Sequence, residues 1–223
     1  FRSVNTGQVL FESLPNERFH PASMIKVPVA MLVMSILESQ GKGPADLPSI
    51  SFGRYTLEQL LRSMLVQSEE EATDSLIDYI YTYTSERTVF KSWGINDTSF
   101  EPRRTTAYDL AAFLSGLYRA EFLSDESSRY ILSLMNVQTE NDASYLGVIP
   151  AMLPNTTLYN KRGTLVSPQV IVSDMGILTS AEHTLLIIVS GRPAPSSEIT
   201  YEEIQASLEN FAAEVARAIS RLP

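Results

Sequence analysis

One segment constrains the fold more than any other, because residues 23–40 predict a helix that is apolar on almost every side. The predicted helix begins at Ser23 and ends before Gly41 and Gly43, and its apolar residues are Val27, Val29, Ala30, Met31, Leu32, Val33, Met34, Ile36 and Leu37. A surface helix has one apolar stripe, so a helix of this kind belongs in the middle of a domain. The chain of 223 residues is long enough for one compact domain around it.

The rest of the chain predicts helices first and strands afterwards. A short hairpin arm covers residues 4–12, and helices are expected within 56–83 (two, separated by 67–70), over 105–118 and 124–135, and over 201–221. Residues 136–156 are expected to be rich in loops, and strands are expected over 157–166, 169–179 and 184–190, with turns at 167–168 and 181–183. This order predicts an α+β fold of three layers, α/β/α, in which helices flank an antiparallel sheet and an all-helical subdomain adjoins it.

Composition excludes several classes of function. The formal net charge is −9 and the sequence contains no basic run, so we expect no nucleic-acid partner. The chain has no cysteine, which excludes thiolate catalysis, disulfides and cysteine-based metal sites. No apolar run approaches the roughly 20 residues that span a bilayer, so we expect no transmembrane segment. Phe1 reads as the middle of an element, and any signal segment is expected to lie outside the chain given.

The two histidines offer little for catalysis or metal binding. His20 lies beside a proline ahead of the apolar helix, and His183 lies in a predicted turn. A zinc site needs three or more ligands at defined spacing, and no such spacing is present. We therefore expect surface or packing roles for both histidines, no metal or cofactor, and a catalytic base other than histidine.

A serine and a lysine at the head of the apolar helix form a plausible nucleophile and base. Ser23 and Lys26 are three residues apart, so they share one face of the helix. A serine needs an adjacent base to become nucleophilic, and a desolvated lysine can serve. A lysine within so apolar a helix is costly unless it has a partner or a task. Two further polar motifs follow in order: Ser68 between two predicted helices, and Lys161-Arg162-Gly163-Thr164 in the first predicted strand.

Together these motifs resemble the class A β-lactamase and DD-peptidase superfamily of penicillin-recognising serine hydrolases, whose boxes are S-x-x-K, S-x-N and K-[TS]-G. The resemblance covers nearly the whole chain, lacking the N-terminal helix and part of the first strand of the family. Further segments that resemble the family are Asn5–Gly7, Arg18–Ser23, Thr105–Leu110, Ile149–Pro154 and Ser190–Pro193.

The resemblance implies a role for each matching residue. Ser23 attacks an amide carbonyl and forms an acyl-enzyme, Lys26 takes its proton, and Ser68 relays a proton to the leaving nitrogen. Lys161 binds the substrate carboxylate and holds the hydroxyl of Ser68. The backbone N–H groups of Ser23 and Thr164 form an oxyanion hole, and Gly163 belongs to the substrate-binding strand.

Two residues depart from the boxes of the family. Glu70 stands where the S-x-N box has asparagine, and an ionised glutamate can only accept hydrogen bonds. Near Lys26 it would form an ion pair and raise the pKa of the lysine. Arg162 replaces the threonine or serine of the K-[TS]-G box, and its guanidinium either faces the cleft and binds a carboxylate or points away from it.

A third departure concerns the loop that carries the deacylating base in the family. Glu101-Pro102 resembles the start of that motif, but only Arg103 and Arg104 separate it from Thr105, and no E-x-x-L-N sequence follows. We therefore interpret Glu101 as a surface turn residue and expect deacylation to be slow.

Three functions remain open at this point. The first is a serine hydrolase acylated at Ser23 by a β-lactam or related amide, the second a DD-peptidase-like cell-wall peptidase or amidase, and the third a non-catalytic binding protein on the same fold. We expect one β-lactamase-like domain over residues 1–223, with a sheet part (1–20 and 157–223) and a helical part (23–156). We also expect a small-molecule or peptide substrate and a monomer. The resemblance implies export to the periplasm or cell surface.

Overall fold

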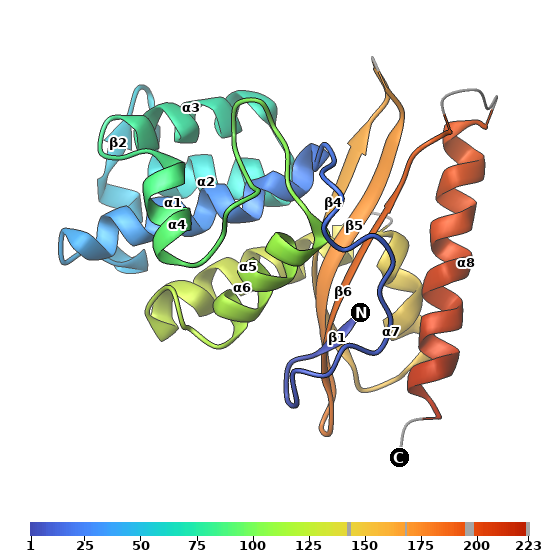
Figure 1. Ribbon diagram of the computed structural model, residues 1–223. Coiled ribbons are helices and arrows are strands. Elements are labelled where there is room, and N and C mark those ends of the chain that lie inside the picture. Colours follow the sequence, from blue (N-terminus) through green and yellow to red (C-terminus); the bar gives the residue numbers. More distant parts are fainter. Residues whose placement is uncertain (142–143, 168, 195–198, 222–223) are drawn as a thin grey trace.

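A four-stranded antiparallel sheet separates a block of helices from one long C-terminal helix in the computed structural model (Figure 1). The structure describes residues 1–141, 144–167, 169–194 and 199–221. The strand order is β1 (Arg2–Ser3), β6 (Thr184–Gly191), β5 (Ile171–Thr179) and β4 (Thr157–Leu165), so that β4 forms one edge of the sheet. The predicted α+β fold of three layers is confirmed.

Side chains alternate between the two faces of the sheet, as they must in extended strands. On β5, Met175 and Ile177 join the core of the helical block, whereas Leu178 packs on the opposite face with the C-terminal helix. The register pairs Lys161 of β4 with Met175 and Arg162 with Asp174. Lys161 therefore faces the helical block, and Arg162 faces the C-terminal helix.

The helical block is built around the apolar helix. A 3-10 helix, η1 (Ala22–Ile25), leads directly into α1 (Lys26–Ser39), whose residues from Lys26 to Met34 are all buried. Around α1 lie α2 (Leu57–Val66), α3 (Glu70–Tyr81), α4 (Glu86–Ser92), α5 (Ala107–Tyr118) and α6 (Asp125–Asn141), with a 3-10 helix η2 (Pro44–Ser49) and a small hairpin of β2 (Ser51–Phe52) and β3 (Tyr55–Thr56). The predicted central position of this helix is confirmed.

Three elements cover the other face of the sheet. They are η3 (Tyr145–Gly147), α7 (Val148–Met152) and α8 (Tyr201–Ile219), and α8 runs along the sheet on the side away from the helical block (Figure 1). Apolar residues of α7 and α8 pack with Leu158, Leu178 and Leu185 of the sheet. The sheet is therefore buried on both faces.

The expected elements differ from the structure in a few places. Helix α6 continues to Asn141, although residues 136–156 were expected to be rich in loops, because no proline or glycine interrupts it there. Helix α4 had no counterpart among the expected elements. The predicted turn at residues 167–168 includes Pro168, which lies outside the described residues.

The expectation that no apolar run could span a membrane needs correction. The window Ala22–Ser39 is long and apolar enough to do so by length and composition. However, 78% of that window is buried inside the protein, as expected for the core helix of a folded domain. This observation is weak evidence for a membrane span.

Candidate active site

Ser23 lies on η1, at a point where the backbone is strained. The preceding residue, Ala22, has a φ of 47°, in the left-handed region that residues other than glycine rarely adopt. The N–H of Ala22 donates a hydrogen bond to Nδ1 of His20 at 3.0 Å, which helps to hold this conformation. One helical turn further on, Nζ of Lys26 donates to Oγ of Ser23 at 3.0 Å.

Lys26 is fully buried and surrounded by oxygen atoms. Its Nζ donates to the carbonyl of Ser68 at 2.6 Å and lies 3.3 Å from Oγ of Ser68, and it forms an ion pair with Oε1 of Glu70 at 2.6 Å. Burial lowers the pKa of Lys26 below its ordinary value, although the hydrogen bond and charge of Glu70 act in the opposite direction. The predicted ion pair is present and Glu70 acts to raise the pKa of the lysine, as predicted, but burial outweighs it and the net shift is downward.

Ser68 lies between two lysines. It occupies the turn between α2 and α3 with a φ of 62°, a second left-handed residue at this site. Its Oγ accepts a hydrogen bond from Nζ of Lys161 at 3.0 Å, while Lys26 approaches from the other side. Lys161 is also fully buried. The hydroxyl of Ser68 thus connects Lys26, at the start of α1, with strand β4.

Gly163 brings β4 close to the segment that carries Ser23. A Cβ atom at this position would lie 2.6 Å from Oγ of Ser173, 2.8 Å from the carbonyl oxygen of Pro21 and 3.2 Å from Cβ of Ala22. Only glycine fits without displacement of the backbone. Thr164 follows on the edge strand, where alternate backbone groups are not used by β5 and can face a substrate.

Arg162 occupies the other face of β4. Its guanidinium lies 5.6 Å from the ring centroid of Tyr145, which is buried with residues of α8. Of the two orientations left open by the sequence, this placement favours the one that points away from Lys161. The hydroxyl of Tyr145 lies 3.3 Å from Oγ1 of Thr164 on the same face.

Glu70 is held by a second cation that the sequence reasoning missed. Arg103 forms an ion pair with Oε2 of Glu70 at 2.6 Å and another with Asp74 at 3.1 Å. Burial raises the pKa of Glu70, but the hydrogen bonds from Lys26 and Arg103 together bring it below its ordinary value. Glu70 is therefore ionised at neutral pH, and each of its oxygens has a cationic partner.

The remaining titratable candidates lie outside this cluster or at its border. Glu101 is exposed, and its charge contributes to the raised pKa of Tyr81 of α3. His183 lies in the turn before β6, as predicted. His20 lies at the border of the site, where its Nδ1 accepts a hydrogen bond from the N–H of Ala22. Burial, and then the charge of Arg103, lower the pKa of His20. Within the described part of the chain, no three carboxylate or imidazole side chains are placed to hold a metal ion.

The structure therefore brings together Ser23, Lys26, Ser68, Lys161 and Glu70, with Gly163 against the nucleophile segment, and it keeps Glu101 and the side chain of Arg162 apart from them. No motif in the sequence distinguishes Arg103 from any other loop arginine. Its position depends on the path of residues 99–104, where Ser99 and Arg104 form an antiparallel bridge.

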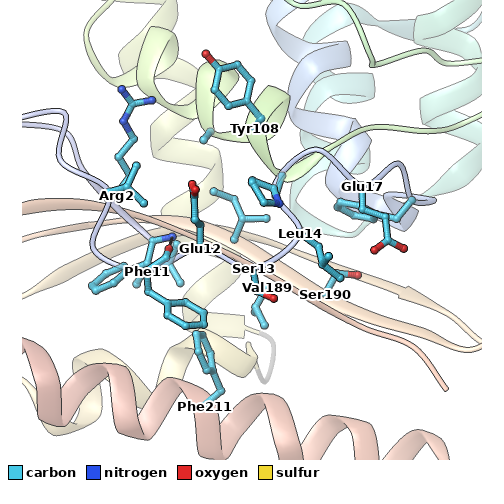
Figure 2. Close-up of a pocket in the computed structure, with 18 of the residues that line it drawn as sticks. Arg2, Phe11, Glu12, Ser13, Leu14, Glu17, Tyr108, Val189, Ser190 and Phe211 are labelled. Atoms are coloured by element: carbon cyan, nitrogen blue, oxygen red, sulfur yellow. Dashed lines mark hydrogen bonds between the residues drawn. The ribbon is translucent and has the colours of Figure 1, made fainter. Parts of the chain in front are cut away.

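A cavity of about 520 Å³ lies along β6 and the N-terminal segment, towards the β1 edge of the sheet and away from β4. Figure 2 shows that the N-terminal segment passes over β6 there, with Phe11 directed towards Phe211 of α8 and Tyr108 on the opposite rim. Neither Ser23 nor Lys26 lines this cavity. It is thus separate from the candidate active site.

The sequence matches one protein family over nearly its whole length. The family model described as "Beta-lactamase enzyme family" matches residues 1–221. A search of curated proteins found no significant match.

Solved structures of similar fold cover almost the whole chain. The β-lactamase from Sphaerobacter thermophilus is 21% identical, with a TM-score of 0.79 over 100% of this chain and 90% of its own. The β-lactamase from Chitinophaga pinensis is 18% identical, with a TM-score of 0.74 over 96% and 92%. PBP-A is 19% identical, with a TM-score of 0.72 over 93% and 84%. At these identities the likeness shows the fold alone.

Proposed function

Because the chain belongs to the β-lactamase enzyme family, we propose that it is a serine hydrolase that forms an acyl-enzyme at Ser23 with a β-lactam or related amide. Membership of this family indicates a hydrolase, and the fold suits a small-molecule substrate. One observation carries the proposal: Nζ of Lys26 lies 3.0 Å from Oγ of Ser23 within a fully buried setting that lowers the pKa of the lysine.

The proposed acylation uses the contacts around Lys26 and Ser68. The neutral amine of Lys26 takes the proton of Ser23 as Oγ forms a bond to the carbonyl carbon. When the C–N bond of the amide breaks, the hydroxyl of Ser68 gives its proton to the leaving nitrogen. Protonated Lys26, 3.3 Å from Oγ of Ser68, then returns a proton to that oxygen. Lys161 holds the hydroxyl of Ser68 at 3.0 Å and keeps its positive charge for a substrate carboxylate.

Substrate binding is proposed for the edge of β4. The backbone N–H groups of Ser23 and Thr164 stabilise the oxyanion, and losing one such donor typically costs about 3 kcal/mol. Gly163 allows the two backbones to approach closely enough for both groups to serve one oxygen. A variant of PBP-A has been solved as an acyl-enzyme complex with penicillin G, which gives a precedent for acylation on this fold.

We propose that deacylation is slow. The deacylating step needs a carboxylate that activates water. Glu101 is exposed on the loop, and its charge acts on Tyr81 and is not among those that shift the pKa of Lys26. Glu70 does contact Lys26, but its lowered pKa makes it a weak base. The acyl-enzyme should therefore accumulate.

Intact mass after incubation with a fluorescent penicillin tests this proposal. We expect a stable adduct on the wild-type protein and none on Ser23→Ala. Absence of an adduct at every pH between 6 and 10 would refute acylation and favour a non-catalytic binding protein. Rapid hydrolysis of a chromogenic cephalosporin would instead refute slow deacylation.

The placement of Glu101 also favours a second candidate, a cell-wall peptidase or amidase of the DD-peptidase kind. For such an enzyme a β-lactam is an inhibitor and not the substrate. It therefore does not need the base that rapidly hydrolyses the β-lactam acyl-enzyme. Release of D-alanine from a peptide ending in D-Ala-D-Ala, blocked by prior acylation with penicillin, would identify this activity. Both classes of substrate are found outside the cytoplasmic membrane of bacteria, so we also propose that the protein is exported. We further propose that it is a monomer.

A further inference from the structure

The carboxylate of Glu70 is shared between two cations on opposite sides. Oε1 accepts from Lys26 at 2.6 Å, and Oε2 accepts from Arg103 at 2.6 Å. Arg103 is itself fixed by Asp74 at 3.1 Å, and only 22% of its side chain is exposed. This bridge determines how Glu70 lies against Lys26.

The two cations differ in their ability to lose a proton. A guanidinium keeps its charge throughout the accessible pH range, whereas a buried amine can become neutral. Arg103 therefore always competes for the charge of Glu70, and its own charge acts against the ammonium form of Lys26.

Other charged groups also surround the lysine. Glu70 at the start of α3 and Glu69 just before it favour its ammonium form, while Nζ of Lys161 on β4 lies across the hydroxyl of Ser68. Within the described residues, the charged or titratable groups that face Lys26 are Glu69, Glu70, Arg103, Lys161 and, at the border of the cluster, His20. Among these groups, two cations contact Glu70 directly, namely Lys26 and Arg103.

We propose that Arg103 is a positioning residue for acylation: by holding Glu70 in a bridge to Asp74, it limits how strongly Glu70 retains the proton of Lys26. Lys26 can then accept the proton of Ser23 near neutral pH. This inference rests on the proposed function, in which Lys26 is the base. It assigns to the short loop after Glu101 a task in the site, although that loop has lost the sequence of the deacylating motif.

Direct titration of the lysines tests the inference without any substrate. The chain has four lysines, so protein labelled with ¹³C at lysine Cε gives four signals, and Lys26→Arg identifies the one of interest. In Arg103→Ala we expect the titration midpoint of Lys26 to rise by about one pH unit. Arg103→Lys, which keeps a positive charge, should shift it less, and Arg104→Ala on the exposed neighbour should leave it unchanged.

The pH profile of acylation by fluorescent penicillin gives a second readout. A rise of one unit leaves about tenfold less neutral lysine near pH 7, so Arg103→Ala should react about tenfold more slowly there and recover at alkaline pH. A purely structural role would slow the reaction equally at every pH. That result, or an unmoved midpoint for Lys26, would overturn the inference.

Two further arms keep the test decisive. If Arg103→Ala does not fold, Asp74→Ala removes the anchor of Arg103 at an exposed position, and a smaller upward shift of the Lys26 midpoint is expected. If the wild-type protein is not acylated by any substrate, the proposed function fails, while the lysine titration still decides whether Arg103 controls the charge of Lys26.

Discussion

The chemistry of this site depends on a difference between two side chains of similar size. An asparagine amide both donates and accepts hydrogen bonds, whereas ionised Glu70 only accepts. Both oxygens of Glu70 are already engaged, by Lys26 and by Arg103. Glu70 therefore has no donor for a substrate carbonyl, and its charge favours the protonated form of the lysine.

Replacing Glu70 with asparagine should make acylation faster. Glu70→Asn removes the negative charge beside Lys26, which lowers the pKa of the lysine further and supplies an amide donor. We expect acylation by fluorescent penicillin at pH 7 to rise about tenfold, as for a shift of one pKa unit. Glu71→Asn, one residue further along α3 and well exposed, is the matched control. An unchanged rate in Glu70→Asn would show that the charge of Glu70 does not limit acylation.

At this scale the sequence predicted contacts better than it predicted pKa values. The spacing of Ser23 and Lys26 is enough to place them together, and the ion pair of Lys26 with Glu70 follows from the turn that carries Ser68. A lysine in an apolar helix is expected to have a lowered pKa, but the balance between burial and Glu70 could not be predicted, because it depends on how completely Lys26 is buried. Arg103 could not be predicted either, because its position depends on the path of a loop.

Strand β4 positions the site as an element. It lies at the edge of the sheet, with Lys161 directed at Ser68, and Gly163 packs against the carbonyl of Pro21 just ahead of the nucleophile. A strand at an edge has backbone groups free for a substrate, while its inward side chains remain fixed by the core.

A methyl group at Gly163 should separate β4 from the nucleophile segment. In Gly163→Ala the added Cβ would lie 2.8 Å from a backbone oxygen, so either the strand or η1 must move. We expect acylation to fall at least a hundredfold, because small misplacements of reacting groups cost that much, with a modest loss of stability. Gly43→Ala, at a site where the nearest atom is 3.7 Å away, is the control. Fluorescent penicillin labelling and urea unfolding measure both effects, and an equal labelling rate in the two variants would contradict the packing argument.

The elements were predictable where apolar periodicity was strong. Helices α1, α2 and α5 and the three long strands lie within a few residues of the expected ranges, because each has a regular buried face. Helix α6 was expected to end near Met135, yet it runs on to Asn141. Its last turns (Asn136-Val137-Gln138-Thr139-Glu140-Asn141) carry almost no apolar residue, so periodicity has no signal there, although no helix breaker is present either.

For the molecule as a whole, the order of elements predicted the layers. Helices followed by an antiparallel meander and a final helix allow few arrangements, and the all-round apolar α1 had to be central. What the order could not predict is the burial of polar groups inside the sheet. Asp174 of β5 is such a group, fully buried on the face that α8 covers.

Asp174 connects the end of the helical segment to the sheet. Its carboxylate accepts hydrogen bonds from Oγ of Ser144 at 2.7 Å, from the N–H of Leu146 at 3.1 Å and from Nδ2 of Asn160 at 2.9 Å. Burial raises the pKa of Asp174, and these hydrogen bonds offset only part of that rise. The folded protein therefore binds a proton at Asp174 more tightly than the unfolded chain does.

The stability of the whole fold should consequently depend on pH through this residue. An aspartate in the unfolded chain has a pKa of about 3.9, so the contribution of Asp174 is complete below that pH and is lost as the pH rises through the higher pKa of the folded state. Asp174→Asn does not titrate. Urea unfolding of both proteins at pH 4, 6 and 8 should therefore show the variant gaining on the wild type with rising pH, by on the order of 1 kcal/mol for each unit of pKa difference. Comparing the two proteins at each pH cancels the titration of all other groups, so a difference that stays constant from pH 4 to pH 8 would show that the pKa of Asp174 is the same in the folded and unfolded states.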